Sequence, residues 1–360
     1  MVARGMLVGG LCVAVAGTAL PVAAQQAERY QVTGGRVAIY NLAGEATLVA
    51  GSGSAVTIEV TRGGADAERL GIERGPIGDR ETLRVLYPDD RIVYRTDDRR
   101  HGSSTMRVRD DGTFGDSWDD QGRRGGRNSG RRVEVRSSGS GMDAHADLRI
   151  QVPRGQRVEI YLAVGRIDVT NVEGDLLLDG SASEVTTSGT VGSLVIDVGS
   201  GQVRVSNARG LLDVDTGSGA VDVTDVSGDE LKVDTGSGSV SVRGATVARF
   251  NIDTGSGGVD GTGIAADVVA VDTGSGSVNL GFTRSPGEIE IDTGSGGVTL
   301  ALPAAYAATV ELETGSGGIE LDFPVQVRRW ERDAVRGTIG DGSGRLTVET
   351  GSGGIRIRKS

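Results

Sequence analysis

The residues that could most plainly take part in chemistry are the acids of a repeated pentapeptide. Asp-Thr-Gly-Ser-Gly begins at Asp215, Asp234, Asp253, Asp272 and Asp292, and Glu-Thr-Gly-Ser-Gly begins at Glu313 and Glu349. Asp-Thr-Gly-Ser is also the active-site tetrapeptide of pepsin-like proteases, in which two aspartates face each other and share one proton. The copies in this chain are equivalent and regularly spaced, which predicts a row of carboxylates and not a facing pair. The motif therefore does not predict a protease.

Two other roles remain open for the row of carboxylates. Each Asp can accept hydrogen bonds from the amides of the Gly-Ser-Gly turn that follows it, which would make the row structural. Stacked carboxylates about 5 Å apart also repel one another and attract cations. The calcium-binding nonapeptide of β-solenoids has a different pattern, with its Asp at a position that this repeat lacks. We expect the structural role, and the sequence predicts no catalytic, cofactor-binding or metal-ligating residue.

Histidine and tryptophan offer little further chemistry. His101 and His145 show no spacing typical of metal ligands. Trp118 and Trp330 could each stack on a sugar ring, but they are isolated in the sequence. For Trp330 we favour packing near the C-terminal end of the fold.

Charge is divided unevenly along the chain. Residues 147–325 contain 26 Asp and Glu against 10 Lys and Arg, a net of −16, whereas residues 326–360 contain 8 Lys and Arg against 4 acids, a net of +4. An acidic body repels phosphate groups, so nucleic acid is not an expected partner. One basic cluster could hold an anionic polymer, although a solvated loop is the favoured interpretation: Arg123, Arg124, Arg127, Arg131 and Arg132.

The spacing of the pentapeptides indicates the architecture. Degenerate copies precede them at Asp179 and Asp197, and successive intervals are 18, 18, 19, 19, 19, 20, 21 and 36 residues. We interpret the last interval as two repeats of 18 with the middle marker lost. Such a period is typical of a stacked repeat protein. The 60 glycines follow no Gly-X-Y period, which excludes collagen, and aromatic residues make up only 3% of the chain. A narrow core of small aliphatic side chains fits this composition.

Apolar residues alternate around every marker, as in strands with one buried face. In one repeat these are Leu231, Val233 and Val240, with Lys232 and Ser241 pointing outward. A single repeat cannot bury its apolar side, whereas stacked repeats about 4.8 Å apart can. We therefore predict an all-β fold, a β-solenoid of about ten rungs of 18–21 residues. Glycine in the turns would serve either positive φ or close approach of neighbouring rungs.

Both ends of the predicted solenoid carry specific expectations. The final residues Ile355–Ser360 alternate apolar and basic, which we interpret as a terminal edge strand that avoids pairing with another molecule. Before the repeats, residues 25–96 contain strand patterns and read as a β region or as divergent first rungs of the same stack. Residues 97–146, rich in Arg, Asp and Gly, read as a flexible insertion with a possible hairpin near Met106–Val108. The solenoid repeats span residues 147–360.

The N-terminus has the pattern of a secretory signal peptide. Arg4 precedes the apolar run Met6–Leu20, and Val22-Ala23-Ala24 predicts cleavage before Gln25, so residues 1–24 would be removed. Cys12 lies inside this segment and its context is a poor match to a lipoprotein signal. We expect an exported protein, located in the periplasm, at the cell surface or outside the cell. Its mature chain would contain no cysteine and no transmembrane segment.

The repeated Val-Asp-Thr-Gly-Ser-Gly unit and the closing run Ile339–Ile357 resemble the bacterial putative adhesin family, which is similar to the toast-rack domains of envelope proteins. The resemblance covers about residues 30–360 outside the insertion. It implies an exported or envelope-tethered solenoid and carries over no catalytic residue. We expect a non-enzymatic, adhesin-like binding or structural scaffold for an envelope or extracellular protein or polysaccharide. The alternatives are an envelope sensor or regulatory partner and, more remotely, a polysaccharide-acting β-helix enzyme.

Overall fold

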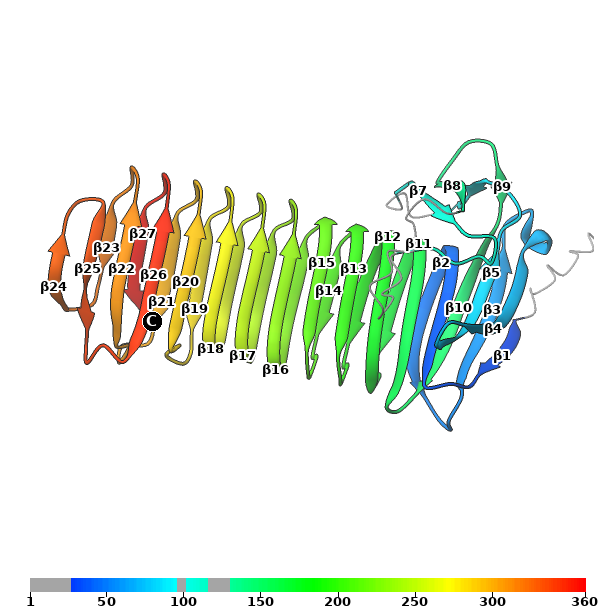
Figure 1. Ribbon diagram of the computed structural model, residues 1–360, viewed down its shortest axis with the longest axis horizontal. Helices are drawn as coiled ribbons and strands as arrows, with labels where there is room; N and C mark the ends of the chain where they lie inside the picture. Colours follow the sequence, from blue (N-terminus) through cyan, green and yellow to red (C-terminus); the bar gives the residue numbers. More distant parts are fainter. Residues whose placement is uncertain (1–26, 96–101, 116–129) are drawn as a thin grey trace, which may run out of the picture.

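The computed structural model describes residues 27–95, 102–115 and 130–360. Figure 1 shows these residues as a long rod in which successive rungs lie side by side. Apart from one 3-10 turn, η1 (Ala67–Arg69), every named element in the described ranges is a β-strand. The predicted all-β solenoid is confirmed.

One long side of the rod, which we call the aspartate face, is formed by the residues that precede each Gly-Ser-Gly turn. Its strands pair in this order: β4 (Gly71–Ile77), β5 (Arg80–Leu86), β2 (Arg36–Gly51), β11 (Gln156–Thr170), β12 (Gly174–Ser188), β13 (Leu194–Ser200), β15 (Leu212–Ser218), β16 (Val221–Thr235), β17 (Val240–Thr254), β18 (Val259–Thr273), β20 (Glu288–Thr293), β26 (Gly344–Thr350), β22 (Ala308–Thr314), β25 (Ala334–Ile339) and β24 (Val325–Trp330).

A second long side, the valine face, is formed by the residues that follow each turn. It comprises β1 (Glu28–Val32), β3 (Val56–Gly63), β10 (His145–Pro153), the other halves of β2, β11 and β12, then β14 (Val203–Ser206), β16, β17, β18, β19 (Val278–Phe282), β21 (Val298–Leu302), β27 (Ile355–Lys359) and β23 (Ile319–Leu321). The longest strands run from one face to the other, so a rung is one nearly continuous wrap of chain.

The core between the two faces is built as the alternation predicts. Val240 is 1% exposed and pairs in register with Val221 on one side and Val259 on the other, whereas Ser241 is only partly covered. Phe250 occupies the equivalent of Leu231 in the next rung and is also buried. Each rung therefore covers the apolar residues of its neighbour, and the free energy of burial comes from stacking rather than from any single rung.

The structure distinguishes the two roles that glycine could have in the turns. A Cβ on Gly238 would lie 1.7 Å from the carbonyl oxygen of Gly219, so the Gly-Ser-Gly turns need glycine because rungs approach closely. Positive φ occurs in one of these turns, at Gly201 with φ 144°, and also at a different corner, after the valine face, where Asn207 has φ 53° and Gly244 has φ 71°. Asn and Gly are the residues that adopt this conformation at least cost.

The C-terminal end differs from the predicted order of rungs. The last rung, β26 and β27, lies between the rung of β20 and β21 and the rung of β22 and β23. The prediction that Ile355–Ser360 forms a terminal edge is therefore wrong, because β27 is paired on both sides. The 36-residue interval contains no lost rung either. It holds the antiparallel hairpin β24–β25, which extends the aspartate face beyond β22 (Figure 1).

At the other end, the N-terminal strands belong to the same stack as the repeats. β2 pairs in parallel with β11, with Val37 opposite Val158 and Ala46 opposite Ile167. β2 therefore extends the parallel stack beyond β11 toward the N-terminal end.

Strands from the described parts of the region predicted as a flexible insertion join β6 (Arg91–Val93), which precedes that region, in a small sheet with the order β7 (Ser104–Val108), β8 (Arg131–Arg136), β6 and β9 (Met142–Asp143). Val133 and Val135 are fully buried. β7 pairs with the distant β8 and does not form a local hairpin. We call β7, β8 and the loop Arg109–Gly115 the flap.

Candidate functional site

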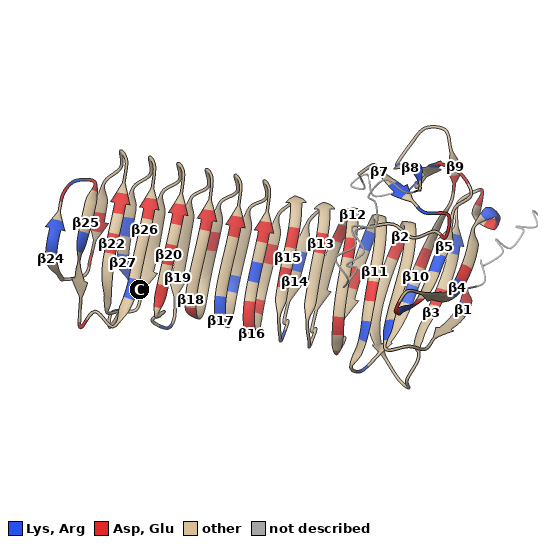
Figure 2. Cartoon of the chain, in the orientation of Figure 1, with Lys and Arg blue, Asp and Glu red and all other residues tan. Residues whose placement is uncertain are grey.

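A column of nine carboxylates runs along the aspartate face, one from each successive rung. Figure 2 shows it as a red band near the ends of the strands. The members pair in register in this order: Asp179, Asp197, Asp215, Asp234, Asp253, Asp272, Asp292, Glu349 and Glu313. The expected row of equivalent acids is thus the observed arrangement. The inserted C-terminal rung contributes Glu349 and keeps the column unbroken.

For the rungs that follow Asp215, the expected role of the acids in the turns is wrong. In these rungs, the Gly-Ser-Gly turn is held by the threonine after the acid: Thr254 Oγ1 accepts a hydrogen bond from the amide of Gly257 at 2.9 Å and donates one to the carbonyl of Gly238 at 3.3 Å. Thr273 and Thr293 make the same pair of bonds. These threonines are fully buried. The threonine hydroxyl bonds the backbone of the turn from the core side. The acid is the preceding residue of the same strand, so its carboxylate points outward.

Repulsion between neighbouring carboxylates affects the pKa of one member of the column, Asp215. Partial burial and the neighbouring carboxylate of Asp234 raise the pKa of Asp215, and Lys232 only partly offsets the shift. Lys232 lies two residues before Asp234 and pairs across the strands with Asp213, whose carboxylate is 3.4 Å from the Lys232 Nζ. Like charges at the separation of neighbouring rungs disfavour simultaneous ionisation. The aspartate face therefore carries a concentrated negative potential.

At its C-terminal end the column meets a basic side chain. Arg336 of β25 contacts Glu311 at 2.5 Å and Glu313 at 2.6 Å, both on the adjacent strand β22. The guanidinium spans two outward carboxylates that are two residues apart. This contact ends the acidic column with an ion pair across neighbouring strands.

At its N-terminal end the column continues as aromatic residues. Tyr161 occupies the position next to Asp179, and Tyr40 follows in the next strand. The two rings stack with centroids 4.4 Å apart, and Phe114 of the flap packs edge-on against Tyr40 at 5.9 Å. Burial raises the pKa of Tyr40 to about 12. The flap therefore covers the outer surface of the first rungs, where aromatic side chains replace the exposed acids.

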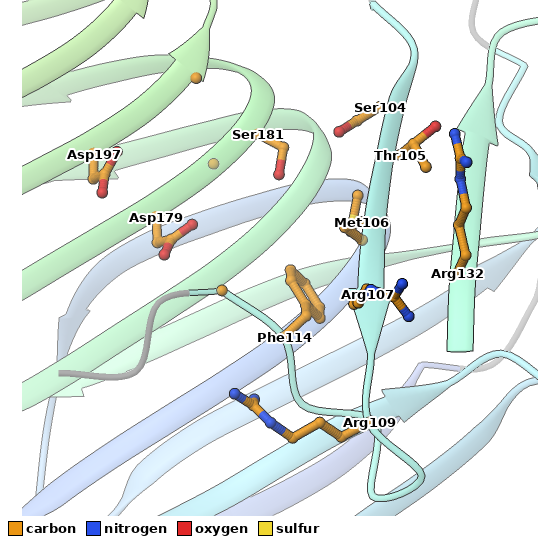
Figure 3. Close-up of a pocket in the computed structure, with 13 residues that line it drawn as sticks. Ser104, Thr105, Met106, Arg107, Arg109, Phe114, Arg132, Asp179, Ser181 and Asp197 are labelled. Carbon is orange, nitrogen blue, oxygen red and sulfur yellow. The ribbon is translucent and has the colours of Figure 1, made fainter. Parts of the chain in front are cut away.

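A groove of about 730 Å³ lies where the flap ends and the exposed column begins (Figure 3). One wall is formed by the flap: by β7, by Arg109 and Phe114 of its loop, and by Arg132 of β8. The other wall is formed by turns of two rungs, including Asp179, Ser181 and Asp197. Figure 3 shows Ser104 and Met106 on the side of β7 that faces these turns. The groove combines cationic, anionic, hydroxyl and apolar groups, so it can contact a polar chain that follows the column.

Beside the flap, the structure contains a buried ion cluster that the sequence did not indicate. Glu159 is fully buried and accepts hydrogen bonds from Arg36, from Arg80 at 3.1 Å and from the Tyr161 hydroxyl at 3.2 Å. It lies in β11 between the buried core residues Val158 and Ile160. The arginines that cover it lie more than 70 residues away in sequence, and no local pattern reveals them.

The other residues considered from the sequence are dispersed. His145 lies in β10 with Nε2 3.9 Å from Asp147, and Trp330 lies at the C-terminal end of the rod, 53% exposed. Arg131 contacts Asp90 and the Tyr87 carbonyl, and Arg132 lines the groove. Outside the described residues lie the signal segment with Cys12, His101, Trp118, Arg123, Arg124 and Arg127. In the described ranges no three His, Cys, Asp or Glu side chains are grouped to hold a metal ion.

Stacked parallel rungs, buried threonines beside glycine turns and an outward column of acids define this chain as an elongated β-solenoid of the toast-rack class. It belongs to the Toastrack family DUF4097, whose model matches residues 116–358. This confirms the resemblance to a toast-rack domain of unknown function. No curated protein matches the chain.

A solved structure described as a putative cell adhesion protein from Clostridium sporogenes is 9% identical, with 93% of this chain and 99% of that chain covered and a TM-score of 0.20. The family assignment rests on the family match and not on this likeness. In the part of the chain that the structure describes, no helix has the length and apolar character needed to cross a membrane.

Proposed function

We propose that this protein is an exported, cell-envelope or surface-associated β-solenoid that acts as an adhesin-like binding or structural scaffold. The observation that carries the proposal is the unbroken column of nine outward carboxylates on a rigid, in-register sheet. A surface that repeats one chemical group at a fixed spacing matches a partner that also repeats, such as a polysaccharide or an extended protein. Family membership is compatible with this role, and export is supported by the signal pattern of residues 1–24.

The column suits weak contacts repeated many times. An exposed carboxylate contributes little by itself, because water and salt screen it. Contacts made by several rungs to one polymer act together, since each one raises the effective concentration for the next. The acidic face favours a partner that offers hydroxyl or cationic groups.

The test is capture of envelope components by the immobilised mature chain, residues 25–360. We expect capture that declines when Asp234 and Asp253 are both changed to Asn and when salt is raised. Asp222→Asn with Asp260→Asn is the matched control, because it removes two outward carboxylates from the valine face. Equal loss in the two double variants, or no capture by the unaltered chain, would contradict the proposal.

The groove beneath the flap favours one second candidate, an envelope sensor or regulatory partner. Its walls come from two parts of the chain, the flap and the first exposed rungs. Removal of the whole region Asp97–Arg132 would strip Phe114 from Tyr40, so a gentler variant is needed. Replacing residues 116–129 by a Gly-Ser linker of equal length should leave an adhesive rod able to bind, whereas a sensor that depends on this region should lose its partner.

A further inference from the structure

The edge strands at the two ends of the rod, β4 and β24, differ in the features that obstruct pairing with another strand. At the N-terminal end, β4 contains Pro76, and its Arg74 lies over the ring of Tyr30 at 5.3 Å. Proline and a charge over an aromatic ring both obstruct the addition of another strand. At the C-terminal end, β24 contains no proline, has one irregularity in its register between Val327 and Arg329, and pairs only with β25 among the described strands. Its outer row of backbone donors and acceptors is available.

The inner side of β24 is apolar but incompletely covered. Val327 pairs with Gly337 and Trp330 pairs with Val335, and both of these β25 residues are buried, so Val327 and Trp330 lie on the side of the sheet that faces the core. They are nevertheless 51% and 53% exposed, the highest values among the large apolar side chains described. The hairpin therefore extends past the residues that cover the core. One further strand beside β24 would cover Val327 and Trp330.

The outer side of β24 carries Arg329, which pairs opposite the exposed Arg336 and donates hydrogen bonds to the carboxylate of Glu331 at 2.8 Å, and Arg328 lies beside it at an irregularity in the register. These two cations determine what kind of strand fits. Two copies of β24 placed edge to edge would add further arginines to Arg329 and Arg336, which already lie opposite each other on β24 and β25, and like charges on adjacent strands are destabilising. A strand with outward carboxylates would instead be attracted. The chain contains this arrangement one and two strands away, where Arg336 of β25 bridges Glu311 and Glu313 of β22. Arg356 and Glu320 form a similar cross-strand pair at 2.7 Å on the valine face.

We propose that the free edge of β24 receives an extended segment of a partner protein by strand addition. The segment would alternate aliphatic side chains, which cover Val327 and Trp330, with carboxylates, which face Arg328 and Arg329. Main-chain hydrogen bonds would supply affinity and the alternating side chains would supply specificity. This interaction uses the end of the rod and is independent of any ligand on the column of nine carboxylates.

The probe is a synthetic peptide with the sequence of residues 287–294, Gly-Glu-Ile-Glu-Ile-Asp-Thr-Gly, which alternates acids and apolar residues as in β20. It is added to the mature chain carrying Trp118→Phe, so that Trp330 is the only tryptophan. We expect a saturable blue shift of the Trp330 emission as the peptide covers the ring. A second peptide with Lys in place of each Glu and Asp should bind at least about tenfold more weakly.

Variants then locate the site, with calorimetry as the readout in the natural Trp118 background. Trp330→Ala should weaken peptide binding about tenfold or more, as for loss of a central aromatic anchor. The double variant Arg328→Glu with Arg329→Glu should reverse the preference toward the Lys peptide. Val268→Ala, which trims another exposed valine of the aspartate face (39% exposed), is the matched control and should bind normally. Circular dichroism verifies that each variant keeps its strands.

Three results would overturn the proposal. Equal binding of the acidic and basic peptides would show that Trp330 is merely an adhesive apolar patch. Absence of any shift at millimolar peptide would show that the edge does not accept a strand. A dimer in sedimentation that becomes monomeric with Trp330→Ala would show that a second copy occupies the edge.

Discussion

The central rungs and the C-terminal end of the solenoid use the same strand sequences, yet their chains are connected differently. From β16 to β18 each rung stacks on the one before it in sequence. At the C-terminal end, β26 enters between β20 and β22, which precede it. Both arrangements keep apolar, acidic and threonine columns in register, with Thr350 between Thr293 and Thr314. The repeat therefore specifies how rungs stack but not in which order.

Equivalent residues are also buried to different extents in the central rungs and at the C-terminal end. A residue in the centre is covered by a rung on each side, whereas β23, the last described strand of the valine face, is paired on one side only. Val240 is 1% exposed, while Ile319, at the same place relative to its marker, is only partly buried. The cost of an identical substitution should therefore depend on where along the rod it is made.

The largest expected effect comes from placing a charge in the centre. Val240→Lys buries an unpaired ammonium group between Val221 and Val259 and should cost several kcal/mol of unfolding free energy. Ile319→Lys should cost less, because the side chain can reach water from the end of the rod. Ser241→Lys, on the outer side, should cost under about 1 kcal/mol. Chemical denaturation measures all three, and similar losses for Val240→Lys and Ser241→Lys would refute the register.

The next effect contrasts the buried cluster under the flap with an exposed pair in the centre. Glu159→Gln leaves Arg36 and Arg80 without their shared carboxylate, which should cost about 3 kcal/mol because the site is buried. Asp213→Asn breaks only an exposed pair with Lys232 and should cost less than about 1 kcal/mol. Denaturation midpoints of both variants provide the measurement. A smaller loss for Glu159→Gln than for Asp213→Asn would mean that the cluster is not structurally important.

Features that depend on local patterns could be predicted from the sequence, whereas features that depend on contacts between distant segments could not. Positions around the markers, such as Val233 and Val240, could be assigned because alternation and period are local patterns that recur in each rung. The insertion of β26, the covering of Tyr40 by Phe114 and the cluster around Glu159 depend on contacts between distant segments. For the candidate site, the sequence indicated the row of acids but assigned the turn to the wrong side chain. Asp and Thr both bond turn amides, and only the backbone geometry shows which one faces inward.

A smaller effect tests the threonine in the turn, again by comparing two rungs. Thr254→Val removes the hydroxyl that accepts from the amide of Gly257 and leaves that amide unsatisfied, at a cost of about 1–3 kcal/mol. Thr216 is equally buried, but its hydroxyl has no hydrogen-bond partner, and the preceding rung already has Val198 at this position. Thr216→Val should therefore be neutral or slightly stabilising. Thermal melts of the two variants decide between this assignment and a general requirement for threonine.

The smallest expected effect concerns the acidic column itself and depends on pH. Because burial and Asp234 raise the folded-state pKa of Asp215, its ionised form opposes folding at neutral pH, and the penalty disappears as the pH falls through that pKa. Asp215→Asn should thus stabilise the protein at pH 7, by about 0.5 kcal/mol or less because the site is exposed, and the gain should vanish below the ordinary pKa of aspartate.

Glu184 on the valine face is the opposite case and serves as the control. Although partial burial alone would raise it, hydrogen bonds from Arg204 and Arg166 hold its pKa below the ordinary value. Its ionised form therefore supports folding, fully above the unfolded-state pKa and less as the pH falls. Glu184→Gln should destabilise the protein at pH 7 and converge with the unaltered chain in acid. Added salt should diminish both differences, since exposed charges are screened. If the two variants shift stability in the same direction at pH 7, repulsion along the column does not distinguish the two faces.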